Sequence, residues 1–219
     1  GSEMCIRDSV LEALKVKINL EPSDIEKEIN DNNFGFMFAP NYHSAMRFVG
    51  PVRKKIGKRT IFNMIGPLSN PALVDRQVVG VFDKKLLKIF AEALKNLNLK
   101  KAIIVNSHDG LDEISPYANS SIVELSNKTV KETILNPNDL GIKADKFENI
   151  VGKGPDYNSE KMKEIFQGKD NDFSIAVCLN AAAGLIVADK AGSFKEGYIK
   201  LRDHILSGKV IDHISKLQS

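Results

Sequence analysis

A strand–helix–strand pattern in the middle of the chain constrains its fold more than any other feature. The β-rich run "QVVGVF" (residues 77–82) is followed by a helical pattern, "KKLLKIFAEALKNLNL" (84–99), and then by a second apolar run, "KAIIVN" (101–106). Two strands joined by one helix at this spacing form a βαβ unit, with parallel strands and a right-handed crossover. The sequence therefore predicts an α/β protein with a mostly parallel central sheet flanked by helices.

The flanking segments predict a hairpin and a helix-rich remainder. Residues 120–135, "SSIVELSNKTVKETIL", read as two strands turning at "SNK", which we expect to form an antiparallel annex. The apolar run at residues 173–188 contains Asn180 and is too short to span a bilayer comfortably, so we interpret it as a buried core helix. Two further helix starts show capping-box spacings, Ser23 with Glu26 after Pro22 and Ser193 with Glu196.

Composition sets broad limits on class and compartment. The 219 residues are enough for one sizeable core, and the net charge of +3 argues neither for nor against a polyanionic partner. Cys5 and Cys178 lie far apart and form no metal-ligand spacing, so we expect a reduced, cytoplasmic protein. No charged segment precedes an apolar one as in a secretory signal. Residues 1–9, "GSEMCIRDS", fit no periodic pattern, and we interpret them as a non-native or artefactual leader.

The densest stretch of turn residues, residues 34–72, predicts a binding site, because irregular backbone inside a compact domain usually lines one. If Pro51 marks a first helical turn, Arg53 lies where backbone N–H groups are exposed, and together they would bind a carboxylate or phosphate. The alternative is a solvated basic face. His43 is either a structural histidine or a polar contact of a small-molecule pocket. Gly66 and Pro67 predict a tight turn beside whatever occupies the cleft.

Two adjacent acids, Asp112 and Glu113, occupy a turn just after the predicted strand at residues 101–106. Ligands of open parallel sheets bind outside the carboxyl ends of the strands, where this turn would lie. Mg²⁺ prefers oxygen ligands and is commonly shared between one or two carboxylates and substrate phosphates. The pair is therefore either a Mg²⁺ site or a solvated loop, and the pattern alone leaves both open.

The longest of these motifs resembles a known enzyme family. Residues 38–72, "FAPNYHSAMRFVGPVRKKIGKRTIFNMIGPLSNPA", are similar to the central signature of the anthranilate phosphoribosyltransferases, and "GLDEISP" (110–116) resembles that family's metal-binding turn. The segments "NPNDLGI" (136–142) and "LNAAAGL" (179–185) follow in the family's order. The resemblance runs from Val10 to the C-terminus, and it predicts a phosphoribosyltransferase catalytic domain over residues 10–219.

The resemblance implies an activity and a role for each candidate residue. The family transfers the phosphoribosyl group of phosphoribosyl pyrophosphate (PRPP) to the amine of anthranilate, releasing pyrophosphate, in tryptophan biosynthesis. Arg53 matches the arginine that binds the anthranilate carboxylate, and His43 matches a histidine of the anthranilate channel, beside the turn of Gly66 and Pro67. Asp112 and Glu113 match the pair that binds Mg²⁺. No residue is assigned as a general acid or base.

One part of the family pattern is absent from these residues. The phosphate-binding Gly-Thr-Gly-Gly-Asp loop and the Lys-His-Gly-Asn signature of the family do not occur in the sequence, nor does the N-terminal helical domain. We therefore expect a C-terminal fragment that is inactive alone. The family is typically homodimeric, with contacts largely in the absent part.

Two other functions stay open. A non-catalytic, nucleic-acid-binding relative of the same fold would use the basic run "VRKKIGKR" (52–59) for phosphate contacts. A pyrimidine nucleoside phosphorylase of similar fold would catalyse another reaction. The acidic turn and Arg53 favour the enzyme, and "RTIFNMIGPLSNP" (59–71) favours the anthranilate family over the phosphorylase. We expect neither nucleic acid nor a membrane as partner.

Overall fold

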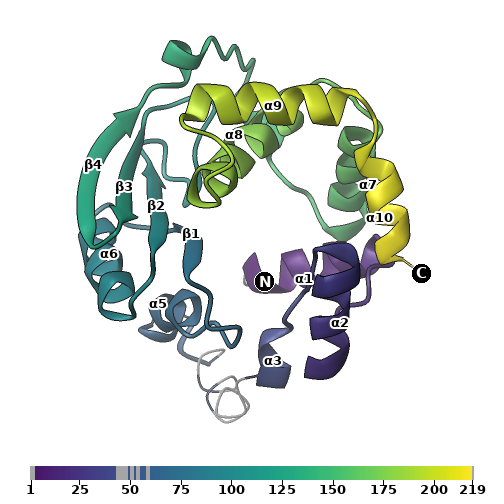
Figure 1. Cartoon of the computed structure of the whole chain (residues 1–219). Coiled ribbons are helices and arrows are strands. Elements are labelled where there is room, and N and C mark those ends of the chain that lie inside the picture. Colours follow the sequence, from purple (N-terminus) through teal and green to yellow (C-terminus); the bar gives the residue numbers. More distant parts are fainter. Residues whose placement is uncertain (1–2, 43–48, 50–51, 53–54, 58–59, 219) are drawn as a thin grey trace. The chain divides into compact units, whose positions relative to one another are not determined.

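The computed structural model describes residues 3–42, 49, 52, 55–57 and 60–218 (Figure 1). The chain divides into two compact units. One contains residues 1–66, 152–168 and 208–219, and the other contains residues 67–151 and 169–207. None of the described helices combines the length and apolar character that a membrane span requires.

The second unit is built on a four-stranded sheet with the strand order β1-β2-β3-β4. Its strands are β1 (Arg76–Gly80), β2 (Lys101–Ser107), β3 (Ser120–Ser126) and β4 (Thr129–Leu135). β1 and β2 pair in parallel and are joined by helix α6 (Leu86–Asn96), so the predicted βαβ unit is confirmed. The α/β class is confirmed as well.

The sheet is mixed, whereas the sequence predicts one that is mostly parallel. β2 pairs antiparallel with β3, and β3 pairs antiparallel with β4. The predicted hairpin is therefore present, but it continues the central sheet and is not an annex to it. Asn127 and Lys128 form its two-residue turn, both with positive φ (46° and 67°), as a type I′ hairpin turn requires.

Helices cover both faces of this sheet. All residues of β2 after the first are buried, so the strand is covered on two sides. Helix α6 packs against β2 and β3, and helix α8 (Asp172–Val187) packs against β1 and β2 (Figure 1). Helix α9 (Phe194–Leu206) lies along α8. Nine of the α8 residues are buried, which confirms the buried core helix.

Capping fixes where the helices around the sheet begin. Asn171 caps α8 through a reciprocal capping box with Ser174, which the sequence analysis missed. The Ser193 side chain caps α9 by accepting the Glu196 N–H at 3.2 Å, as predicted. The Glu196 carboxylate, however, accepts the N–H of Gly192 and not that of Ser193.

The first unit is helical. Its helices are α1 (Glu3–Ala13), α2 (Pro22–Asn32), α3 (Ala39–Tyr42), α5 (Phe62–Ile65), α7 (Pro155–Phe166) and α10 (Val210–Leu217). Its core contains Val10, Leu14, Val16 and Leu217. Pro22 begins α2 as predicted, but the capping box is wrong, because the N-cap is Glu21 and no side chain caps this helix. Helix α1 begins at Glu3, within the nine residues that we interpret as a leader.

A buried carboxylate at the start of α8 holds the segment that leads into the 3₁₀ helix η3 (Phe147–Ile150). Asp172 is 8% exposed and accepts hydrogen bonds from the Tyr117 hydroxyl (3.0 Å), the Asn149 amide (2.8 Å) and the N–H groups of Asp145 and Lys146. Burial alone would raise the pKa of Asp172, but these hydrogen bonds lower it below the ordinary value of 3.8. Burial and the same contact raise the pKa of Tyr117, so its hydroxyl remains a donor.

We predict that Asp172→Asn lowers the free energy of unfolding by about 1–3 kcal/mol at neutral pH, because a charged acceptor of several donors is lost. A carboxyl whose pKa is lowered by folding stabilises the folded state above its unfolded pKa, and this stabilisation is lost as pH falls through the folded pKa. The difference between the variant and the wild type should therefore shrink as pH falls below 3.8. Urea unfolding at pH 7 and in steps from pH 4 to 2 measures both effects.

Asp139→Asn is the matched control, since Asp139 is an exposed carboxylate of the same unit. It should change the unfolding free energy by no more than about 0.5 kcal/mol. Equal stability of Asp172→Asn and wild type at pH 7 would show that the four hydrogen bonds contribute nothing.

Candidate functional site

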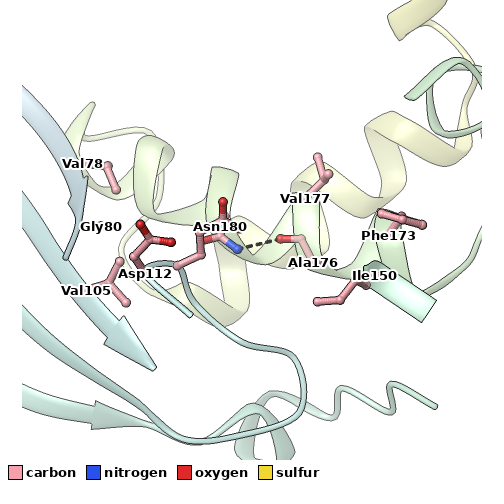
Figure 2. Close-up of a pocket in the computed structure, with 10 residues that line it drawn as sticks. Val78, Gly80, Val105, Asp112, Ile150, Phe173, Ala176, Val177 and Asn180 are labelled. Atoms are coloured by element: carbon pink, nitrogen blue, oxygen red, sulfur yellow. Dashed lines mark hydrogen bonds between the residues drawn. The ribbon is translucent and has the colours of Figure 1, made fainter. Parts of the chain in front are cut away.

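A pocket of about 470 Å³ opens at the carboxyl ends of β1 and β2, within the second unit. Figure 2 shows Val78, Gly80, Val105 and Asp112 on its sheet side. The other lining residues are Glu113 beside Asp112, Ile150 at the end of η3, and Phe173, Ala176, Val177 and Asn180 on α8. The pocket thus has an acidic end at the turn and an apolar wall along the helix, and the two predicted metal ligands both line it.

A close backbone contact holds the acidic turn against the end of β1. A Cβ atom on Gly80 would lie 1.6 Å from the carbonyl oxygen of Asp112 and 2.8 Å from its carbonyl carbon. No side chain fits in that space, because the obstructing atoms are backbone. Gly80 therefore allows Asp112 to lie directly over the last residue of the strand.

Buried serines hold the far side of the turn. The hydroxyls of Ser107 and Ser120 are 2.6 Å apart and accept the N–H of Ser115 at 3.0 and 3.1 Å. The Ser115 hydroxyl donates to the Asp109 carboxylate at 2.6 Å and accepts the N–H groups of Tyr117 and Ala118. The three serines are at most 2% exposed, so the network fixes the loop between β2 and β3.

A third anchor comes from α8. The Asn180 side chain accepts the N–H of Ile114 at 2.8 Å and donates to the carbonyl of Ile114 at 2.9 Å. Its second N–H donates to the Ala176 carbonyl at 3.0 Å, the dashed line in Figure 2. The Asn180 side chain therefore binds both backbone polar groups of Ile114, the residue that follows Glu113.

The donor set of the turn suits a hard divalent cation that is shared with a ligand. Asp112 and Glu113 provide carboxylate oxygens at the pocket, and Mg²⁺ is usually bound by one or two carboxylates with phosphate oxygens and water completing the shell. Among the described residues, no group of three or more His, Cys, Asp or Glu side chains could hold a metal by itself. The residues present thus fit a Mg²⁺ whose remaining ligands are water or phosphate oxygens.

Comparison with known proteins identifies the family. The model of the glycosyl transferase family, a/b domain, matches residues 7–211. The chain belongs to this family. Among curated relatives, the anthranilate phosphoribosyltransferase of Pelagibacter ubique (strain HTCC1062) is 63% identical over 218 residues, which are all of this chain and 66% of the relative. That of Desulfatibacillum aliphaticivorans is 42% identical over 216 residues and is matched over 64% of its length.

Solved structures of the glycosyl transferase family share the fold. Anthranilate phosphoribosyltransferase (TrpD) from Thermus thermophilus has a TM-score of 0.89 and 34% identity, covering 96% of this chain and 63% of that one. The Saccharomyces cerevisiae enzyme in complex with PRPP and Mg has a TM-score of 0.87 and 27% identity, covering 96% and 61%. The chain therefore spans slightly less than two thirds of the length of these relatives.

Of the predicted anthranilate-binding residues, two are described by the structure, Gly66 and Pro67, and neither lines this pocket. His43 and Arg53, like Pro51, fall outside the described residues. Gly66 and Pro67 begin the 3₁₀ helix η1 (Gly66–Leu68), which agrees with a tight turn. Gly66 has helical φ (−48°) and open space at its Cβ position, so its backbone does not require glycine. The Pro67 carbonyl accepts the Gln77 side-chain N–H at 2.7 Å.

Sequence reasoning about this glycosyl transferase chain missed Gly80 and Asn180. Gly80 interrupts a β-rich run, a position that often marks close backbone approach, and Asn180 is the one amide in a mostly apolar helix. Both signals could have been followed, because a polar side chain in the middle of a buried helix needs a partner. The partner itself, the backbone of Ile114, lies 66 residues away and leaves no mark in the local pattern.

We predict that Gly80→Ala displaces the acidic turn and lowers the free energy of unfolding by about 1–3 kcal/mol, the usual cost of forcing extra volume into packed backbone. Gly184→Ala is the control, since Gly184 lies inside α8 and its Cβ would meet nothing within 4 Å. That substitution should be neutral or stabilising by up to about 1 kcal/mol. Urea unfolding of both variants measures the difference, and equal stabilities would contradict the contact at Gly80.

Proposed function

We propose that this chain serves the transfer of the phosphoribosyl group of PRPP to the amine of anthranilate, with release of pyrophosphate, in tryptophan biosynthesis. The observation that carries the proposal is the anchored pair Asp112 and Glu113 in a pocket at the carboxyl ends of two parallel strands. The chain that presents this pair is 63% identical to an anthranilate phosphoribosyltransferase along its whole length.

The chain's own residues would act by binding and orientation. Asp112 and Glu113 would hold Mg²⁺, which when bound offsets the negative charge of the departing pyrophosphate. The anthranilate nitrogen forms a bond to C1 of the ribose while the C1–oxygen bond to pyrophosphate breaks, and the amine proton is then lost to solvent. Arg53 would grip the anthranilate carboxylate and so aim the amine, with His43, Gly66 and Pro67 beside the ring. None of these residues is assigned the role of general base.

The setting proposed for this reaction is the cytoplasm, with Mg²⁺ as the cofactor and a homodimer as the assembly. The Saccharomyces cerevisiae relatives in complex with 4-fluoroanthranilate and with PRPP and Mg support the substrate and metal assignments. Homodimerisation is carried only by the resemblance to the family.

We predict that the 219-residue chain alone binds PRPP weakly, because the Gly-Thr-Gly-Gly-Asp loop whose N–H groups would contact the phosphates is not among its residues. It should also form no phosphoribosyl-anthranilate. Isothermal titration of the chain with PRPP, with and without Mg²⁺, measures the first point. Tight binding that depends on Mg²⁺ would contradict the expectation of an inactive chain, while leaving the assigned reaction intact.

We predict that a chimera, in which this chain replaces the matching 66% of the Pelagibacter ubique relative, catalyses the complete transfer of the phosphoribosyl group to anthranilate. The chimera should consume anthranilate, measured by loss of its fluorescence, only with PRPP and Mg²⁺ present. Asp112→Asn in the chimera should lower kcat/KM by about 100-fold or more, since a metal ion at the leaving group contributes several kcal/mol.

Asp139→Asn is the control within the chimera, because it removes an exposed carboxylate away from the pocket. An inactive chimera beside an active relative would count against the proposed reaction. An active chimera that ignores Asp112→Asn would count against the role of the turn alone.

A further inference from the structure

The contact between Asn180 and Ile114 is a complete amide pairing between a helix and the metal-binding turn proposed above. Both polar groups of the Ile114 backbone bind the Asn180 side chain, at 2.8 and 2.9 Å. Ile114 is only 1% exposed, so water has little access to replace either bond. A side chain that cannot both donate and accept at this position leaves a buried backbone group without a partner.

The helix that carries Asn180 is a rigid support. Cys178, Leu179, Ala182 and Ala183, which all lie within three residues of Asn180, are each at most 1% exposed. The orientation of the Asn180 amide is fixed as well, because its second N–H is bound to the Ala176 carbonyl in the same helix at 3.0 Å. A well-packed helix can therefore transmit its position to the turn through one side chain.

The three anchors divide the turn between them. Gly80 fixes the backbone of Asp112, the serine network fixes Ser115, and Asn180 fixes Ile114 between Glu113 and Ser115. Of these three, Asn180 alone belongs to α8, and it is itself a lining residue of the pocket. Loss of this anchor removes the hydrogen bonds that α8 makes to the backbone between Asp112 and Ser115.

We propose that Asn180 is a positioning residue that sets the affinity of the Asp112–Glu113 turn for a divalent cation. The proposal rests on the function assigned to that turn above. Asn180 holds the Ile114 peptide so that the neighbouring carboxylates converge on one ion without rearrangement. Residues that orient metal ligands in this way typically change metal affinity by about 10–100-fold when they are replaced.

The test uses the 219-residue chain with Mn²⁺ as the probe, because free Mn²⁺ is counted directly by electron paramagnetic resonance. Asn180→Leu keeps the branched shape of the side chain and removes both bonds to Ile114. It should weaken Mn²⁺ binding by about 10–100-fold. The double variant Asp112→Asn/Glu113→Gln should abolish this binding and thereby show that the signal comes from the turn.

Asn149→Leu is the matched control. It removes one side-chain hydrogen bond of similar length in the same unit, to Asp172 at 2.8 Å, and Asn149 is not a lining residue of the pocket. Its Mn²⁺ affinity should equal that of the wild type. A second readout is the hydrogen exchange of the Ile114 amide, which should be faster in Asn180→Leu and unchanged in Asn149→Leu.

The outcomes separate this inference from the function on which it rests. Unchanged Mn²⁺ affinity in Asn180→Leu, with a turn-dependent signal in the wild type, overturns the positioning role and leaves the metal turn intact. If the wild type binds no Mn²⁺, or binds it no more tightly than the double variant, both the positioning role of Asn180 and the metal-binding role of the turn are overturned. If Asn180→Leu does not fold, Asn180→Ser decides by the same comparison, because its smaller side chain admits water to the Ile114 peptide.

Discussion

The site depends on one steric constraint, the approach of the Asp112 carbonyl to the end of β1. The space left by the missing side chain of Gly80 is filled by backbone atoms of the acidic turn, so the turn and the strand have a single relative position. The parallel pairing of Gly80 with Val105 then fixes this position against β2 as well. The two carboxylates are thus placed by backbone geometry, which tolerates much less displacement than contacts between flexible side chains.

Features that follow from local pattern could be predicted from the sequence. The βαβ unit, the hairpin turn at Asn127 and Lys128, and the buried helix at residues 173–188 each depend on periodicity or turn chemistry within about thirty residues. The mixed character of the sheet could not be predicted in the same way. β3 returns to β2 through the loop at residues 108–119, and nothing in that loop's composition shows which strand edge the hairpin joins.

The candidate site shows the same division between local and distant determinants. The acidic pair could be found because both residues are adjacent and chemically distinctive. The anchors of the pair could not, since each is an ordinary residue whose role arises from a distant partner: Gly80 meets Asp112, and Asn180 meets Ile114. A lone glycine in a strand and a lone amide in an apolar helix indicate that a partner exists, but only the fold supplies its identity.

Helix α8 joins the two walls of the pocket into one support. Asp172 in its first turn binds the backbone of Asp145 and Lys146, in the segment that leads to Ile150 on the pocket wall. Asn180, about 12 Å further along the helix at 1.5 Å per residue, binds the acidic turn on the other wall. The capping box at Asn171 fixes where this helix begins and therefore the register of both contacts. The buried face that packs on the sheet thus does more than stabilise the fold, because it also fixes the distance between the apolar wall and the carboxylates.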